Sequence, residues 1–206
     1  MYNGFLLHNV VSPERLPIFE EINKTLNIRV FFCKKEYTSR QTVSNILSDY
    51  SFEYTLGDDI SLPVGENNPL IINWDLLGHL LVNSYDYYIA CENPPIALNI
   101  LTLCFASKLT STPLICWTGE VPQSNFYSNW KRNPYKNILV KSYRKITHKT
   151  ASSHIAYGQR TKNHLLDQEQ LDPGSIFTGT QVVKSPDTES LKSKNKLKKE
   201  YDFSNQ

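Results

Sequence analysis

The sequence has few glycines, and none in the spacing that nucleotide-binding loops require. Only eight of its 206 residues are glycine, and no two of them are separated by a single residue. The GxGxxG loop of dinucleotide-binding enzymes is therefore absent, as are the GxxxxGK(S/T) loop of P-loop nucleotide hydrolases and the GxSxG turn of α/β-hydrolases. These absences argue against a nicotinamide or flavin dehydrogenase, a P-loop enzyme and a serine hydrolase of that type.

The sequence also lacks the usual patterns of a metal site. Its four cysteines form no CxxC pair and its five histidines share no metal-ligand spacing. Each cysteine lies in or beside an apolar run, so we expect buried free thiols in a reducing compartment. His8 falls inside an expected strand, which favours a core residue over a catalytic one. We predict no metal and no cofactor held by this chain.

Long hydrophobic runs are missing too. No stretch has the length and apolar character of a membrane span, and the first residues lack the basic flank and cleavage site of a signal peptide. With 40% hydrophobic and 20% charged residues, the composition is that of a globular chain of one domain or one and a half. We expect a cytoplasmic protein, with attachment to the inner face of the membrane left open.

What the sequence does contain is an uneven distribution of charge. The net charge is +2, yet residues 121–166 hold nine Lys and Arg and no acidic residue. Three interpretations remain open for this block, namely a solvated helix face, a nucleic-acid surface, and contact with an anionic membrane or a phosphate-bearing acceptor. No recognisable nucleic-acid motif accompanies the block, so we rank the membrane or phosphate interpretation above nucleic acid.

A helix is expected over 134–150, and its apolar stripe would comprise Tyr135, Ile138, Leu139, Tyr143 and Ile146. The basic side chains would lie off that stripe, as in helices that bind anionic lipid surfaces. The residues assigned to this membrane or phosphate contact are Lys131, Arg132, Lys136, Lys141, Arg144 and Lys145.

Apolar runs of strand length alternate with segments of helical period along the chain. This alternation, with short connections, predicts an α/β fold with a doubly wound, mostly parallel sheet over 1–183, followed by a charged connector over 184–206. Ser12 is expected to cap the first helix, and Asn73 or Asp75 a later one. The expected strands are 4–11, 28–33, 52–56, 86–91, 113–118, 151–158 and 175–183, and the expected helices are 15–26, 74–84, 94–109, 134–150 and 159–168.

Two glutamates directly follow expected buried strands. In open α/β sheets, ligands bind outside the carboxyl ends of the strands, so the carboxylates of Glu92 and Glu120 could accept hydrogen bonds from sugar hydroxyls. They are the candidates for catalytic groups. The alternative is that each caps the following helix or pairs with a base from residues 121–166.

Three segments together resemble the N-terminal domain of glycosyltransferase family 4, the retaining enzymes of GT-B fold. They are SPERLPIFEEINKTLNIRVFFCKK, then YDYYIACENPPIALNILTLCFASKLTSTPLICWTGEVP, then ASSHIAYGQRTKNHLL with the later DPGSIFTGTQVV. The resemblance covers about residues 2–190 and depends on the order and spacing of all three segments.

The resemblance implies an acceptor-binding, Rossmann-like domain that faces a donor-binding domain across a cleft. A nucleotide sugar would be the donor of the complete enzyme, and the acceptor would be a glycan or a lipid-linked molecule. By matching position, the residues expected to contact the acceptor are Ser12, Arg15, Glu92, Asn93, Trp117, Thr118, Gly119, Glu120, Tyr157 and Arg160.

The chain departs from the family pattern in two respects. Its first loop, Asn9 to Pro13, replaces a glycine-rich loop, and no two of its glutamates stand eight positions apart, although the family's donor half carries a Glu-x7-Glu pair. We therefore expect a chain that is incomplete for catalysis and works with a separate donor domain. The alternative is a non-catalytic module that binds acceptor, membrane or a partner subunit.

Overall fold

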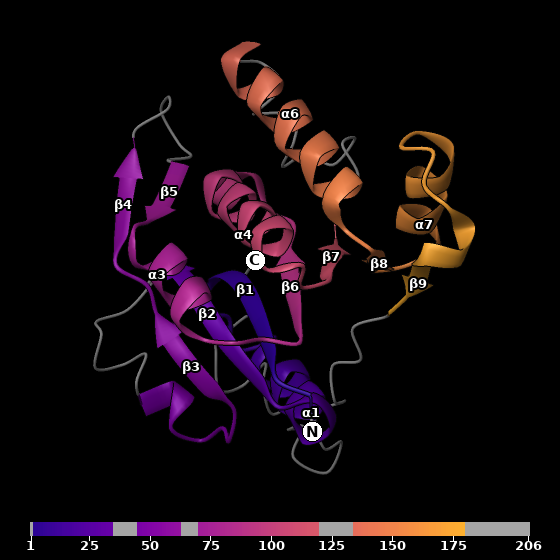
Figure 1. Ribbon diagram of the computed structural model, residues 1–206. Helices are drawn as coiled ribbons and strands as arrows, with labels where there is room; N and C mark the ends of the chain where they lie inside the picture. The colour runs from indigo at the N-terminus through magenta and orange to yellow at the C-terminus, as the bar shows by residue number, and fades with distance from the viewer. Residues whose placement is uncertain (1, 35–44, 63–69, 120–133, 180–206) are drawn as a thin grey trace, which may run out of the picture.

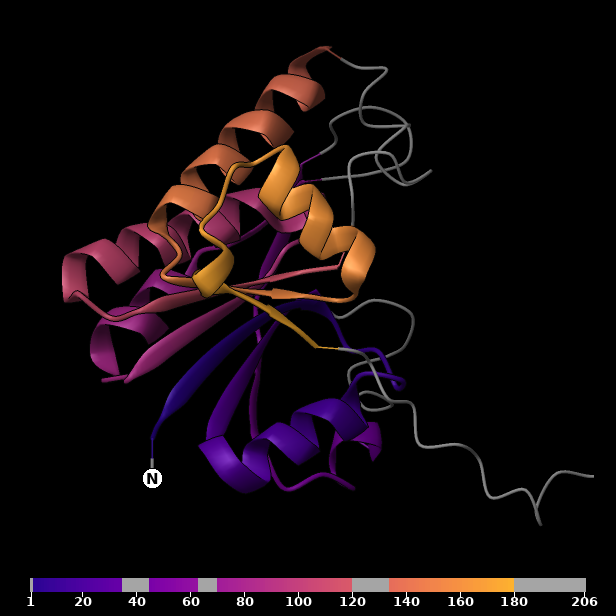
Figure 2. The same ribbon diagram turned by 90° about the vertical axis from the view of Figure 1, so that its right-hand side faces the viewer.

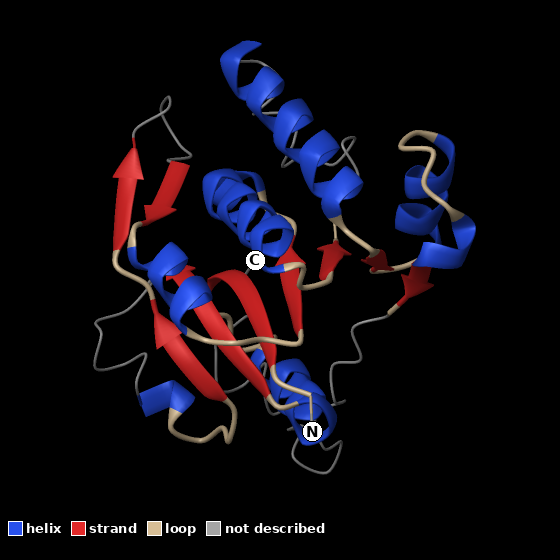
Figure 3. Cartoon of the chain, in the orientation of Figure 1, coloured by secondary structure: helices blue, strands red, loops and turns tan. Residues whose placement is uncertain are grey.

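A seven-stranded sheet forms the centre of the molecule (Figures 1 and 3). The computed structural model describes residues 2–34, 45–62, 70–119 and 134–179. Every neighbouring pair of strands in this sheet is parallel. In spatial order the strands are β3 (Glu53–Leu56), β2 (Ile28–Lys34), β1 (Gly4–Val10), β6 (Tyr87–Cys91), β7 (Leu114–Thr118), β8 (Ser153–Ala156) and β9 (Ile176–Thr178).

The strand order reverses its direction at β1, which is the mark of a doubly wound sheet. Crossovers between parallel strands are right-handed, so the face that a helix covers depends on whether the next strand is added on one side of β1 or on the other. Helix α1 (Leu16–Leu26), which connects β1 to β2, therefore covers one face. The helices α4 (Ala97–Thr110), α6 (Pro134–Thr150) and α7 (Gln159–Asp167) cover the other, as Figure 2 shows. The predicted fold class is confirmed.

Alternate side chains of the strands enter two separate apolar layers. On β1, Phe5 and Leu7 pack with α3 (Asp75–Val82), α4 and α6, whereas Leu6 packs with Phe19 of α1 on the opposite face. All four of these side chains are fully buried, and each contributes about 1.5–3 kcal/mol of transfer free energy. Both faces of the central strands are therefore covered, which explains their uninterrupted apolar sequence.

The two predicted helix caps are wrong. Helix α1 begins at Leu16 after Arg15, with no side-chain capping bond, because residues 13–15 first make a turn in which the Arg15 amide donates to the Ser12 carbonyl over 2.8 Å. Helix α3 likewise has no side-chain cap, since Asn73 is used elsewhere. The side-chain amide of Asn73 donates a hydrogen bond to the Cys33 carbonyl over 3.0 Å.

A two-stranded antiparallel sheet, β4 (Asp59–Leu62) with β5 (Leu70–Asn73), lies beside the main sheet and was not predicted. A buried amide pair ties it to α4, because Asn99 Nδ2 donates to Asn73 Oδ1 over 2.8 Å. The last two strands are shorter than predicted over the described range. The expected connector, residues 184–206, lies outside the described residues.

Candidate functional site

A pocket of about 400 Å³ lies at the carboxyl ends of β1, β6, β7 and β8. Its place is the crevice between β1 and β6, where the strand order reverses and where ligands bind in open α/β sheets. Seven of the ten predicted acceptor-contact residues line it. The lining residues are His8, Asn9, Val10, Val11, Ser12, Pro13, Glu14, Arg15, Cys91, Glu92, Asn93, Trp117, Gly119 and Tyr157.

Apart from the ion-paired carboxylate of Glu92, two polar groups of the pocket lining have no hydrogen-bond partner among the described residues. They are the indole Nε1 of Trp117 and the side-chain Oδ1 of Asn93, and both atoms are buried. Trp117 as a whole is 7% exposed. An unsatisfied buried polar group costs about 1–3 kcal/mol, which a ligand would recover by offering an acceptor to the indole and a donor to the amide oxygen.

Arg15 and Tyr157 form one wall of the pocket. The guanidinium of Arg15 lies over the Tyr157 ring and also donates to the Tyr157 hydroxyl. The ring in turn lies against Gly119, where a Cβ atom would overlap it. Trp117 packs beside the same ring, with 5.6 Å between centroids. The pocket therefore offers adjacent aromatic surfaces together with hydrogen-bond donors.

His8 lines the pocket from β1 and is held neutral. It is 7% exposed, and burial lowers its pKa to about 4 despite the hydrogen bond between Nδ1 and the Val10 carbonyl at 2.9 Å. Its ring packs edge-on against Phe19, with 5.2 Å between centroids. The prediction of a core histidine is confirmed, and a neutral imidazole adds no charge to the pocket.

Glu92 lines the pocket, but its carboxylate is not free for a ligand because it is paired inside the protein. Its side chain is 1% exposed, and Oε1 lies 2.8 Å from Nε of Arg144. Burial alone would raise the pKa of Glu92, but Arg144 and His148 hold it below the usual range. The alternative considered from the sequence, pairing with a base from residues 121–166, is the arrangement found.

The three remaining predicted contacts do not line the pocket. Thr118 is fully buried, with its hydroxyl 3.5 Å from the Cys116 sulfur, so a ligand cannot reach it. Arg160 is exposed on α7 and is not among the lining residues. Glu120 lies outside the described residues.

The predicted apolar stripe of α6 is only partly buried: Tyr143 and Leu139 pack in the core, but the buried face is centred elsewhere. Its buried residues recur at Val140, Tyr143, Arg144, Thr147 and His148, whereas two residues of the predicted apolar stripe, Ile138 and Ile146, are 63% and 46% exposed. The assignment of Arg144 to a membrane or phosphate surface is therefore wrong. Its side chain is 4% exposed because it pairs with the buried Glu92.

The other basic residues of that assignment divide into two groups. Lys141 and Lys145 are exposed on the outer face of α6, together with Lys149. The side chain of Lys136 and the residues Lys131 and Arg132 lie outside what the structure describes. Within the described residues, no helix is long and apolar enough to cross a membrane.

The four cysteines are buried and free, as predicted. Burial raises the pKa of Cys33 and Cys91, and that of Cys104 to about 11, so these three are unreactive thiols. Cys116 differs, since the fold places it with Glu92 and His148 in a buried group whose potential metal-ligand atoms lie within 4.8 Å of one another. Local spacing could not reveal this group because its members come from three elements.

No family model matches this chain, and no curated protein matches it. Among solved structures, it is similar to MurG from Acinetobacter baumannii, with 8% identity and a TM-score of 0.43 over 86% of this chain and 45% of that one. It is also similar to a protein of unknown function from Vibrio parahaemolyticus RIMD 2210633, with 11% identity and a TM-score of 0.35 over 78% of this chain and 95% of that one. The chain thus spans less than half the length of the MurG chain.

Proposed function

We propose that this chain is the acceptor-binding half of a glycosyltransferase related to family 4, and that the pocket at the β1–β6 crevice binds a glycan or lipid-linked acceptor. The observation that carries the proposal is the buried indole N–H of Trp117, unpaired among the described residues and set beside Tyr157 in that pocket. Sugars present apolar C–H faces to aromatic rings and hydroxyls to polar groups. A pocket of this size and lining suits such a ligand.

A donor-binding domain would complete the enzyme. Transfer from a nucleotide sugar requires groups that stabilise the departing diphosphate, and we assign these to a separate domain or polypeptide. The chain would bind the acceptor and fix its orientation towards the donor. Such positioning of the reactants accounts for a large part of the rate acceleration in enzymes. Ser12, Arg15, Asn93, Trp117, Gly119 and Tyr157 are the proposed acceptor contacts.

The decisive measurement is a titration of the labelled chain with methyl glycosides and glycosyl phosphates, followed through the indole N–H signals of its three tryptophans in nuclear magnetic resonance spectra. The Trp117 signal should shift saturably. Trp117→Phe keeps an aromatic surface but removes the donor, and should weaken binding about tenfold, the equivalent of one hydrogen bond. Trp74→Phe is the matched control, because Trp74 is 71% exposed outside the pocket.

Absence of saturable binding, or equal effects of the two substitutions, would contradict the proposal. A second measurement separates enzyme from binding module. Transfer from a nucleotide sugar is expected only when a donor domain is supplied, and turnover by the chain alone would disprove its dependence on that domain. Binding that never leads to transfer with any supplied family 4 donor domain would favour the non-catalytic alternative.

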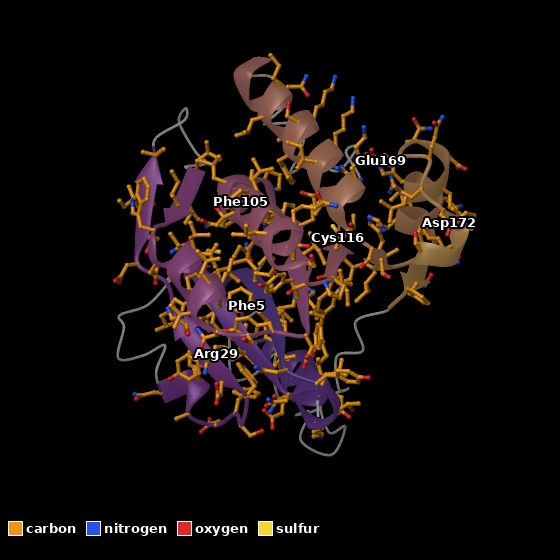
Figure 4. All side chains as sticks on the ribbon, in the orientation of Figure 1. Phe5, Arg29, Phe105, Cys116, Glu169 and Asp172 are labelled. Atoms are coloured by element: carbon orange, nitrogen blue, oxygen red, sulfur yellow. The ribbon has the colours of Figure 1, made fainter. Side chains whose placement is uncertain are left out.

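We propose further that the outer face of α6 rests on an anionic membrane surface at the cytoplasmic side. Lys141, Lys145 and Lys149 project from it together with the exposed apolar side chains of Ile138 and Ile146. The neighbouring helix α4 adds Phe105, which is 60% exposed and labelled in Figure 4. Basic residues near anionic headgroups are worth about 1 kcal/mol each, and apolar side chains add insertion into the interface.

A further inference from the structure

A second group of ionisable side chains lies beneath α6 and borders the pocket through Glu92. Strand register places it there, because Cys116 of β7 pairs with His154 of β8 and with Ala90 of β6. Glu92 follows Ala90 by two residues and so projects to the same face, beneath α6. From α6, Arg144 and His148 reach the group at helical spacing i and i+4. Figure 4 labels Cys116 below α6 and Glu169 between α6 and α7.

Three members of this group are arranged as metal ligands. One ligand atom each from Glu92, Cys116 and His148 lies within 4.8 Å of the others, and all three residues are buried. Oε2 of Glu92 stands 3.6 Å from Nε2 of His148. Around a tetrahedral zinc ion with bonds of about 2.0–2.3 Å, neighbouring ligand atoms are about 3.3–3.8 Å apart. The observed separation falls in that range and exceeds that of a hydrogen bond.

Glu92 and His148 are held by ion pairs rather than by aligned hydrogen bonds. Both carboxylate oxygens of Glu92 and both ring nitrogens of His148 and of His154 are buried without an aligned hydrogen bond among the described residues. His154 is 2% exposed, and its ring meets that of His148 edge-on at 5.3 Å. Native proteins leave few buried polar atoms unsatisfied, and such a concentration indicates a bound ion or water.

The surrounding charges orient the same three residues. Nδ1 of His148 faces Oε2 of Glu169 at 3.7 Å, while Nε2 faces Glu92. A carboxylate behind the distal nitrogen is the usual support of a metal-binding histidine, since it fixes the ring and increases its basicity. Arg144 lies 2.8 Å from Oε1 of Glu92, which leaves Oε2 directed towards His148.

We propose that Glu92 Oε2, Cys116 Sγ and His148 Nε2 bind one zinc ion, with His154 or a water molecule as the fourth ligand. Thiolate, imidazole and carboxylate ligands are the set that zinc takes in proteins. The ion enters with two positive charges, and the cluster releases the thiol proton of Cys116 and a proton from His148. The net charge of the cluster is therefore unchanged, with Glu92 and Glu169 still balanced by positive charge.

The role of this zinc ion is structural. All three ligands are buried, and the side chain of Glu92, which also lines the pocket, is only 1% exposed, so a substrate cannot reach the metal. The ion joins β6, β7 and α6, and Glu92 directly precedes Asn93, which lines the pocket. The proposal does not depend on the glycosyltransferase assignment, because it is argued from the ligand group alone.

The test is zinc binding by the full chain, purified without chelator. Zinc content after dialysis and competition with a fluorescent chelator should give one tightly bound ion per chain. Cobalt substitution should give the near-ultraviolet absorption of a thiolate–cobalt bond. Cys116→Ser should weaken zinc binding on the order of 100-fold or more and abolish that absorption. Cys104→Ser is the matched control, since Cys104 is buried against Thr147 outside the ligand group.

Zinc should also raise the unfolding temperature of the wild-type chain and of Cys104→Ser, but not that of Cys116→Ser. A folded wild-type chain that binds no stoichiometric zinc would overturn the proposal and indicate that water fills the cluster. Equal zinc affinity of Cys116→Ser and Cys104→Ser would overturn it as well. Should Cys116→Ser fail to fold, a cobalt spectrum of the wild-type chain without thiolate absorption decides against it.

Discussion

Arg15 and Tyr157 are 142 positions apart in sequence and share two contacts, a guanidinium carbon 4.9 Å from the ring centroid and a hydrogen bond to the ring hydroxyl. Together they connect the turn after β1 to the residue after β8 at one wall of the pocket. That wall is therefore held by a long-range contact and not by either loop alone.

Tyr157→Phe keeps the ring under the guanidinium and removes only the hydroxyl. We expect the free energy of unfolding to fall by about 1 kcal/mol, the net value of one hydrogen bond, because the cation–π contact remains. Urea denaturation measures this change. Tyr2→Phe is the control, since Tyr2 is 67% exposed, and its stability should match that of the wild type. A loss as large in Tyr2→Phe would contradict the assignment.

Arg144→Met should destabilise the chain by about 3–5 kcal/mol, because it removes a close partner of the buried Glu92 carboxylate and leaves that charge in the interior. Lys145→Met changes the next residue of the same helix, which is exposed, and should stay within about 0.5 kcal/mol of the wild type. Thermal and urea unfolding of both variants provide the comparison. Similar stability of the two would mean that Arg144 is not part of the core.

The folded state should lose stability in weak acid partly through His8. Its pKa is lowered from 6.5 to about 4, so the folded chain favours the neutral ring and the unfolded chain binds the proton first. The stabilisation is complete above pH 6.5 and is lost as the pH falls from there towards 4, by roughly 3 kcal/mol at the limit. The difference in unfolding free energy between wild type and His8→Gln, followed over this range, isolates the contribution. A difference independent of pH would refute it.

Binding to vesicles should depend on the exposed lysines of α6. Lys141→Gln combined with Lys145→Gln removes two charges, about 2 kcal/mol, and should lower partition onto phosphatidylserine-containing vesicles about 30-fold. Lys24→Gln, an exposed lysine on α1 at the other side of the sheet, is the control. Sedimentation with phosphatidylcholine vesicles gives the neutral reference. Equal binding to both kinds of vesicle would exclude the proposed contact.

Much of the fold could be predicted because the central strands and α4 are long apolar runs with clear ends. The hairpin β4–β5 could not, because its strands have four residues each and no clear alternation of polar and apolar residues. The site was predicted only in part. Because Glu92 follows a strand, its location at the carboxyl edge of the sheet could be predicted. The side of the sheet to which its carboxylate points could not, since both faces of the sheet are apolar.

Helix α6 shows the same limit. The apolar stripe expected from the sequence groups Ile138 and Ile146 with Tyr143, yet the structure exposes both isoleucines and buries Arg144 and His148 beside Tyr143. The reason is electrostatic, because Glu92 and Glu169 are available only once β6, α6 and α7 meet. A partner distant in sequence thus outweighs the local hydrophobic pattern, and no property of residues 134–150 alone could reveal it.

The central position of β1 has a kinetic consequence. One edge of β1 pairs with β2, where Gly4 lies opposite Ile28. Its other edge pairs with β6, where Gly4 lies opposite Tyr87. At synthesis rates of 5–20 residues per second, that second partner emerges roughly 4–17 s after β1 itself. Throughout this interval an apolar strand has one unpaired edge, so the nascent chain is most prone to aggregation before its ninetieth residue has been made.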